Sequence, residues 1–364
     1  MKKIGALNLG MAFAGCFLGA GYVSGQELWQ FFGSFGVKGA VGLVIAMAAL
    51  FLVGIMMLEL NRLSGIAEID KLVVRKDIPV LRIAVTVLEL LFLFGVCTIM
   101  AAGCGALINQ LFGIPSWIGS AVLSAAVAYV SLAGLGGMVA AFSATVPLLA
   151  AATLVFGIIS LSQNGVQFSR PEASGTNPLM GSWLVAAITF ACYNLFGNIA
   201  MISPLGEFMK SKKAALGGIA IGTAILVMIA GSVLLSISAQ PSLAEAELPM
   251  LALALGKGKV IGFVYGILLL LAMFGTALSS LVGFTSIIYR KSEGIKSKKT
   301  AFTLVCALAM LGGSLFGFGD LIGVVYPIFG YCSSVFIVLM TEHYIKIKRA
   351  GKVNEKIADK ARGV

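Results

Sequence analysis

The chain has 364 residues, of which 59% are hydrophobic and 11% are charged, and its net charge is +11. Soluble domains carry about 25% charged residues, so this chain has too few charges to cover a water-facing surface. The composition excludes an ordinary soluble protein. It predicts an all-α polytopic membrane protein, because helices satisfy every backbone hydrogen bond within lipid.

Ten apolar stretches are long enough to cross a bilayer core of about 30 Å, which takes about 20 helical residues. They lie near residues 4–32, 39–63, 79–111, 115–133, 138–161, 179–209, 213–237, 258–289, 300–318 and 320–344.

The basic residues divide unequally between the two sides of the membrane. Alternate connections between ten spans face opposite sides of the membrane. One side receives 22 of the 26 Lys and Arg residues, and the other side receives Lys38, Arg170, Lys257 and Lys259. The positive-inside rule places both termini in the cytoplasm. Topogenic charge and anionic lipid account for the net charge, so we expect the bilayer as a partner and no nucleic acid.

Several classes of site have no support in the sequence. The six cysteines lie in apolar spans without metal-ligand spacing, and zinc-protease, nucleophile-elbow and P-loop motifs are missing. We therefore expect no enzyme, no cofactor and no obligate protein partner. Without ATP machinery, any pumping must use an ion gradient.

The first span contains a cluster of residues that disfavour a helix. Gly15, Gly19, Gly21 and Gly25 fall within eleven residues, and Ser24, Gln26 and Glu27 lie among or just after them. The glycines alone are compatible with a small-residue packing face. The polar residues favour an unwound segment whose free backbone groups line a cavity.

The sixth span contains a second cluster of this kind. Asn194, Gly197 and Asn198 lie near its middle, and Pro204 follows. Asparagine competes with the helix for backbone hydrogen bonds, and proline removes a donor.

Spans 1 and 6 begin two halves of five helices each. Because five is odd, the halves have opposite orientations, and interrupted helices in corresponding positions of inverted repeats mark the binding site of a secondary transporter. We expect repeats at residues 1–161 and 179–346, an extracellular loop at 162–178 and a basic cytoplasmic tail at 347–364.

This pattern resembles the LeuT-type fold of the amino acid–polyamine–organocation superfamily. The segment GAGYVSGQELWQFFG (residues 19–33) resembles the bacterial YkvI family of membrane proteins, and the likeness extends over nearly the whole chain. Residues 14–21, 53–65 and 274–280 are similar to three stretches of neurotransmitter:sodium symporters. The resemblance implies a multi-pass protein of the bacterial cytoplasmic membrane.

The eighth span carries hydroxyl groups on one helical face. Thr276, Ser279 and Ser280 are spaced to lie together, and either bond back to their own helix or coordinate a small hard cation. The resemblance implies a sodium site formed by these residues and the carbonyl groups of Gly15 and Leu18, with Gly275 as the alternative to Thr276. The fifth span has no charged residue, whereas some proton-coupled relatives carry a lysine there.

The substrate is expected between the two breaks. Helix N-termini attract a carboxylate, and the resemblance assigns that role to the N–H groups of Ala20 and Gly21. Tyr22 stands where sodium symporters often have an asparagine that binds a second sodium, which disfavours a second site. The remaining candidates for the lining are Tyr193, Asn194, Phe196 and Asn198.

Four acidic residues are candidates for coupling or structural roles. The resemblance implies that Glu59 accepts hydrogen bonds from the unwound backbone. Glu89 lies about 15 Å deep in the third span, where a carboxyl group is either a proton carrier or a hydrogen-bonded structural acid. We expect Glu27 to face the outer vestibule. Asp320 is either an N-cap or an outer gate residue, although the usual arginine partner is replaced by Gly25.

The leading hypothesis is sodium-coupled symport of a small amino-acid-like or zwitterionic solute by alternating access. The alternatives are proton coupling through Glu89 and a non-transporting sensor or channel. A channel would need a continuous polar stripe, whereas the sequence shows only local polar breaks.

Overall fold

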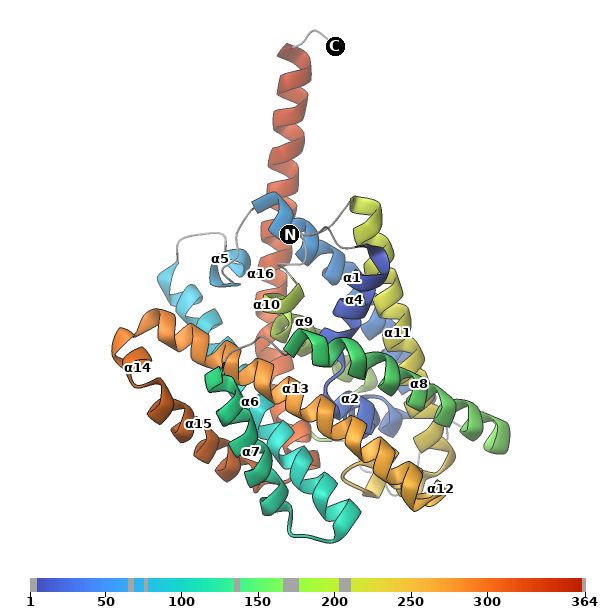
Figure 1. Ribbon diagram of the computed structural model, residues 1–364. Coiled ribbons are helices and arrows are strands. Elements are labelled where there is room, and N and C mark those ends of the chain that lie inside the picture. The colour runs from blue at the N-terminus through green and yellow to red at the C-terminus, as the bar shows by residue number, and fades with distance from the viewer. Residues whose placement is uncertain are drawn as a thin grey trace.

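A computed structural model describes residues 5–64, 69–74, 78–133, 138–165, 177–202 and 211–361. All regular elements in these ranges are helical (Figure 1). Five helices are long and apolar enough to cross a membrane, namely α4 (Val37–Ser64), α6 (Pro79–Phe112), α11 (Lys212–Ala239), α13 (Lys259–Lys291) and α16 (Phe318–Ala361). Five further apolar helices are α1 (Ala6–Phe17), α7 (Ser116–Ala133), α8 (Met138–Asn164), α9 (Trp183–Gly197) and α15 (Lys299–Ser314).

These ten apolar helices of the described ranges correspond in order to the ten predicted spans, and the all-α membrane fold is confirmed. Shorter elements connect them or interrupt them: α2 (Ala20–Ser24), α3 (Gln26–Phe31), η1 (Gly33–Phe35), α5 (Ile69–Val73), α10 (Ile199–Ile202), η3 (Pro241–Glu245), α12 (Pro249–Lys257) and α14 (Glu293–Ser297).

The first span is interrupted twice. The helix α1 ends at Phe17, and α2 begins at Ala20, so Leu18 and Gly19 form the first break. The second break is Gly25, whose φ of 89° lies in the left-handed region that favours glycine. The chain therefore turns between α2 and α3 instead of continuing as one helix.

The sixth span is interrupted at the predicted place. The helix α9 ends at Gly197, Asn198 has φ −104° and ψ 5°, and α10 starts at Ile199. The Asn198 side chain donates to the carbonyl oxygen of Asn194 at 2.9 Å, which is the competition with the backbone that disfavours a regular helix. The predicted contribution of Pro204 lies outside the described residues.

The two interrupted spans lie in the interior of the bundle. The helix α1 packs along α11, and α9 packs between α4 and α16. The helix α6 packs against both α7 and α13. Ring contacts between Phe31, Phe32 and Phe190 join α3 to α9, with centroids 4.9 to 6.4 Å apart. These contacts hold the pieces of the two broken helices against each other.

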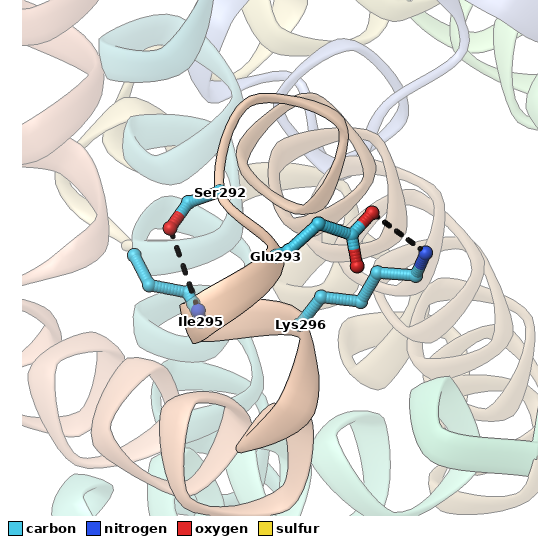
Figure 2. Close-up of polar contacts among 4 residues, drawn as sticks. All are labelled: Ser292, Glu293, Ile295 and Lys296. Atoms are coloured by element: carbon cyan, nitrogen blue, oxygen red, sulfur yellow. Dashed lines mark hydrogen bonds and ion pairs between the residues drawn. The ribbon is translucent and has the colours of Figure 1, made fainter.

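The basic connection after α13 folds into the short helix α14 (Figure 2). The Ser292 hydroxyl accepts a hydrogen bond from the backbone N–H of Ile295 at 3.4 Å and caps the helix. Glu293 and Lys296 form an exposed ion pair at 3.0 Å, which stabilises the helix little because water screens both charges. The helix α1 lies toward the end of the bundle from which α16 projects, and α12 lies at the opposite end (Figure 1).

Substitution of Gly25 tests the turn between α2 and α3. We expect Gly25→Ala to lower the free energy of unfolding by about 1–2 kcal/mol, because an L residue is strained at this φ. The added Cβ would also lie 2.6 Å from Cδ1 of Ile237. Thermal denaturation in detergent measures the effect.

The matched control is Gly231→Ala within α11, where an added Cβ has no neighbour within 4 Å. Alanine there is expected to raise stability by up to about 1 kcal/mol, because it favours the helix. A Gly25→Ala protein as stable as the Gly231→Ala protein would contradict the strained turn.

Candidate functional site

A cavity of about 300 Å³ lies where the two interrupted spans meet. Phe17 and Gly19 line it at the first break, and Gly197 and Asn198 line it at the second. The helices α6 and α13 complete the wall. At the α14 end of α13 the wall reaches Arg290, which is exposed. This arrangement is the one predicted for a binding site between broken helices.

Glu27 is the buried acid of this cavity, and its side chain is only 4% exposed. The Tyr193 hydroxyl of α9 donates a hydrogen bond to its Oε1, whereas the Asn194 side chain donates to the carbonyl oxygen of Phe190 at 3.1 Å. The expectation that Glu27 faces the outer vestibule is wrong. The turn at Gly25 starts a new helix, so Glu27 points back toward α9 instead of following the direction of α2.

An aromatic wall surrounds this carboxylate. The rings of Tyr193 and Tyr326 stack with centroids 4.6 Å apart and an interplanar angle of 17°. Phe92 of α6 lies 6.5 Å from Tyr193, and all three rings line the cavity. Sequence reasoning missed Phe92 and Tyr326, because each lies in an apolar span with no local feature that distinguishes it from a core residue.

Three of the seven predicted substrate residues line the cavity, namely Tyr193, Asn194 and Asn198. Phe196 is buried and packs against Phe336 of α16, with ring centroids 5.7 Å apart. The residues of α2 are displaced from the wall. The buried Tyr22 hydroxyl donates to the carbonyl oxygen of Leu226 in α11 at 2.7 Å.

The other two predicted substrate residues, Ala20 and Gly21, are buried beside Glu27 and do not line the cavity. A Cβ added to Gly21 would lie 2.6 Å from Oε2 of Glu27, so the glycine leaves room for this carboxylate. The position therefore serves the packing of a protein side chain. Binding of a substrate carboxylate by the N–H group of Gly21 stays a prediction.

The predicted sodium ligands fall into two groups. Ser279 and Ser280 line the cavity on the side of α13, whereas Gly15, Leu18 and Thr276 do not. The Ser279 hydroxyl donates to the carbonyl oxygen of Thr276 at 2.9 Å. This bond within its own helix is the alternative to coordination of a cation. At the first break, Gly19 N–H donates to the Phe17 carbonyl at 2.8 Å. Sodium binding at these residues stays a prediction.

The two other carboxylates lie in different surroundings. Glu89 lines the cavity on α6. Glu59 accepts a hydrogen bond from the Tyr344 hydroxyl, and the Lys348 ammonium lies 3.8 Å from it. These contacts connect α4 to α16, and bonds from the broken first span to Glu59 stay a prediction.

Hydrogen bonds close the molecule on the side of α12. Gln30 of α3 donates to the carbonyl oxygen of Gly319 at 3.0 Å, and Asn177 donates to that of Gly323 at 2.6 Å. Glu247 accepts from Gly319 N–H at 2.7 Å. Of the two alternatives for Asp320, the N-cap is wrong, because α16 begins two residues earlier at Phe318 and Asp320 lies exposed in its first turn. The role of an outer gate residue stays a prediction.

Comparison with known sequences identifies two relatives. The chain is 26% identical over 342 residues to the membrane protein YkvI of Bacillus subtilis (strain 168), covering 92% of this chain and 95% of YkvI. It is 26% identical over 331 residues to the protein YyaD of the same organism, covering 90% and 93%. No protein-family model matches the chain. The predicted relation to YkvI is confirmed.

Comparison with solved structures identifies the fold. The crystal structure of MhsT in complex with L-phenylalanine superposes with a TM-score of 0.69 at 16% identity, covering 95% of this chain and 92% of MhsT. The inward-facing conformation of Mhp1 superposes with a TM-score of 0.62 at 14% identity, covering 96% of this chain and 78% of Mhp1. A manganese transporter of Eremococcus coleocola superposes with a TM-score of 0.54 at 14% identity, covering 93% of this chain and 77% of the transporter. The predicted LeuT-type fold is confirmed.

A double-mutant cycle measures the bond between the two broken spans. We expect Tyr193→Phe to lower the free energy of unfolding by about 1–3 kcal/mol, because the buried Glu27 carboxylate loses a donor. In a Glu27→Gln background, Tyr193→Phe should lower the free energy of unfolding by less. The reason is that an amide gains less from this hydrogen-bond donor than a charged carboxylate does. Thermal denaturation of the four proteins gives the coupling.

Tyr326→Phe removes a hydroxyl from the same ring stack and serves as the control. Tyr326→Phe should lower the free energy of unfolding equally in both backgrounds. Additive effects of Tyr193→Phe and Glu27→Gln, or a coupling of Tyr326→Phe to Glu27→Gln as large as that of Tyr193→Phe, would contradict a specific bond between Tyr193 and Glu27.

Proposed function

We propose that this protein is a secondary active transporter that couples sodium entry to symport of a small amino-acid-like or zwitterionic solute. The observation that carries the proposal is the cavity between the two interrupted helices, because broken helices at membrane depth are tolerated where they line a binding site. The solved neighbours of this fold include MhsT, whose structure holds L-phenylalanine, and Mhp1, a nucleobase-cation-symport-1 family transporter.

The shape of the cavity supports alternating access. Bonds at Gly319 and Gly323 close the bundle on the side of α12, whereas the cavity wall reaches the exposed Ser286 and Arg290 near the α14 end of α13. The positive-inside rule assigns that open end to the cytoplasm of a bacterial cell membrane. In the proposed cycle, this arrangement would be the inward-facing stage.

Sodium is the proposed coupling ion because hydroxyl oxygens line the cavity opposite the first break. Hard cations are coordinated by carbonyl, hydroxyl and carboxylate oxygens. Ser279 and Ser280 supply hydroxyls to the same cavity that Phe17 and Gly19 line, where the helix has lost its regular hydrogen bonds. Sodium held between α13 and the first break would stabilise one arrangement of the two elements.

Removal of both hydroxyls tests this site. We expect Ser279→Ala with Ser280→Ala to abolish sodium-dependent thermal stabilisation, because a bound ion raises apparent stability by mass action. The wild-type protein should gain stability as NaCl replaces choline chloride at constant ionic strength. Melting temperatures from a series of sodium concentrations give the apparent affinity.

Ser334→Ala is the matched control, because the Ser334 hydroxyl donates to the carbonyl oxygen three residues earlier, as the Ser279 hydroxyl does. It should leave the sodium response unchanged. An undiminished response in the double variant would refute the proposed site.

Proton coupling is the second candidate, and the position of Glu89 in the cavity wall favours it. A carboxyl group within a membrane span can carry a proton between the two sides when the cavity opens to each in turn. If this mechanism operates, a lower external pH drives solute inward, because protons then enter with the solute.

Substitution of Glu89 distinguishes the two couplings. Under proton coupling, Glu89→Gln removes pH-driven uptake into proteoliposomes and leaves solute exchange intact. Under sodium coupling, a pH gradient drives no uptake in either protein, and Glu89→Gln leaves sodium-driven uptake and exchange intact. Glu293→Gln, in the exposed ion pair of α14, controls for the loss of a carboxylate. An unchanged pH response of the Glu89→Gln protein would exclude Glu89 as the proton carrier.

A further inference from the structure

The charges of the cavity wall indicate what chemistry it accepts. Among the described residues, the wall contains two carboxylates, Glu27 and Glu89, and one cation, Arg290. Arg290 lies exposed in the last turn of α13, whereas Glu27 is buried among the helices of the two breaks. The interior of the cavity is therefore acidic.

Within the part of the chain that the structure describes, no ion pair is found for Glu27. The hydrogen bond to its carboxylate comes from Tyr193, which is uncharged. The ion pairs found in the described ranges involve other acids. Burying a carboxylate without a counter-charge is unfavourable, and hydrogen bonds compensate only part of that cost. A cationic ligand in the cavity would supply the missing charge.

The aromatic wall is suited to the same ligand. The ring faces of tyrosine and phenylalanine attract a cation within about 6 Å of the centroid. Tyr193, Tyr326 and Phe92 all line the cavity beside Glu27. An ammonium group can contact the carboxylate while its carbon substituents lie against these rings. The apolar remainder of the wall, including Leu93, Val96 and Val282, accommodates a hydrocarbon body.

The same carboxylate disfavours an acidic ligand. A substrate carboxylate was predicted at the N–H groups of Ala20 and Gly21. Oε2 of Glu27 already lies 2.6 Å from the position of a Cβ on Gly21. A substrate carboxylate next to Glu27 would add a second negative charge in a site with little water, where like charges repel strongly. Glu27 therefore disfavours a ligand that carries its own carboxylate.

We infer that the cavity binds a cationic amine without a carboxylate, and that Glu27 and the rings of Tyr193 and Tyr326 hold its ammonium group. This inference rests on the proposed transport function and replaces its substrate class, because an amine without a carboxylate is a cation and not a zwitterion. Glu27 is then the residue that determines specificity between an amine and the corresponding amino acid.

The test compares probes that share a hydrocarbon body and differ in whether they carry an ammonium group, a carboxylate or both. One series is phenethylamine, phenylalanine and 3-phenylpropionate, and the second is isopentylamine, leucine and 4-methylpentanoate. Calorimetric titration of the purified full-length protein in 100 mM NaCl gives each dissociation constant. We expect at least one amine to bind roughly tenfold or more tightly than its amino acid, and neither carboxylate to bind.

Three variants assign the effect to Glu27. Glu27→Gln should weaken amine binding roughly tenfold or more, and Glu27→Asp should retain part of it. Glu245→Gln, in the exposed η3 segment, should change nothing. A melting temperature for each variant shows whether it is folded. If Glu27→Gln fails to fold, Tyr326→Phe is tested instead. This variant keeps its ring and should retain amine binding.

Three results would overturn the inference: amino acids that bind as tightly as the amines, amine affinity that Glu27→Gln leaves unchanged, or no amine binding at all. Sodium-driven uptake of leucine or phenylalanine alongside any of these would leave the proposed transport function standing. Absence of uptake for every probe would count against both.

Discussion

The arrangement of the site depends on the hydrogen bond between Glu27 and Tyr193. It joins α3, beyond the break in the first span, to α9, before the break in the sixth, across 166 residues of sequence. A buried carboxylate is tolerated only where donors satisfy it. Loss of this bond would leave the buried carboxylate without this donor, in a wall that also holds the rings of Phe92 and Tyr326. The bond therefore determines how the two broken helices face each other.

Glycine makes this bond sterically feasible at two positions. Gly25 adopts a left-handed conformation that turns the chain toward α9, and Gly21 leaves the space that the carboxylate occupies. Breaks at Leu18, Gly19 and Asn198 release backbone groups from helical hydrogen bonding, which is tolerated at membrane depth only beside a cavity. The features that weaken the two helices are thus the features that build the site.

Local sequence features predicted the breaks, and long-range packing determined which side chains line the cavity. Glycine and asparagine act on their own segment, so the interruptions at Gly19 and Asn198 are recognisable from the sequence. The direction of Glu27 depends on the φ of Gly25 and on a partner in another helix. Tyr326 lies in an apolar span, and only the packing of α16 against α9 makes it part of the wall. For the same reason Tyr22 and Phe196 were predicted to contact substrate but are bound to α11 and α16.

The central claim is that an ion gradient drives solute through this cavity by alternating access. The most direct measurement is uptake of radiolabelled phenethylamine and phenylalanine into proteoliposomes, with and without an inward sodium gradient at equal pH. The account predicts that the sodium gradient concentrates at least one of these solutes above its external level, and that collapsing the gradient returns the solute to equilibrium. Entry of every solute only to equilibrium, at rates that no ion gradient changes, would contradict it.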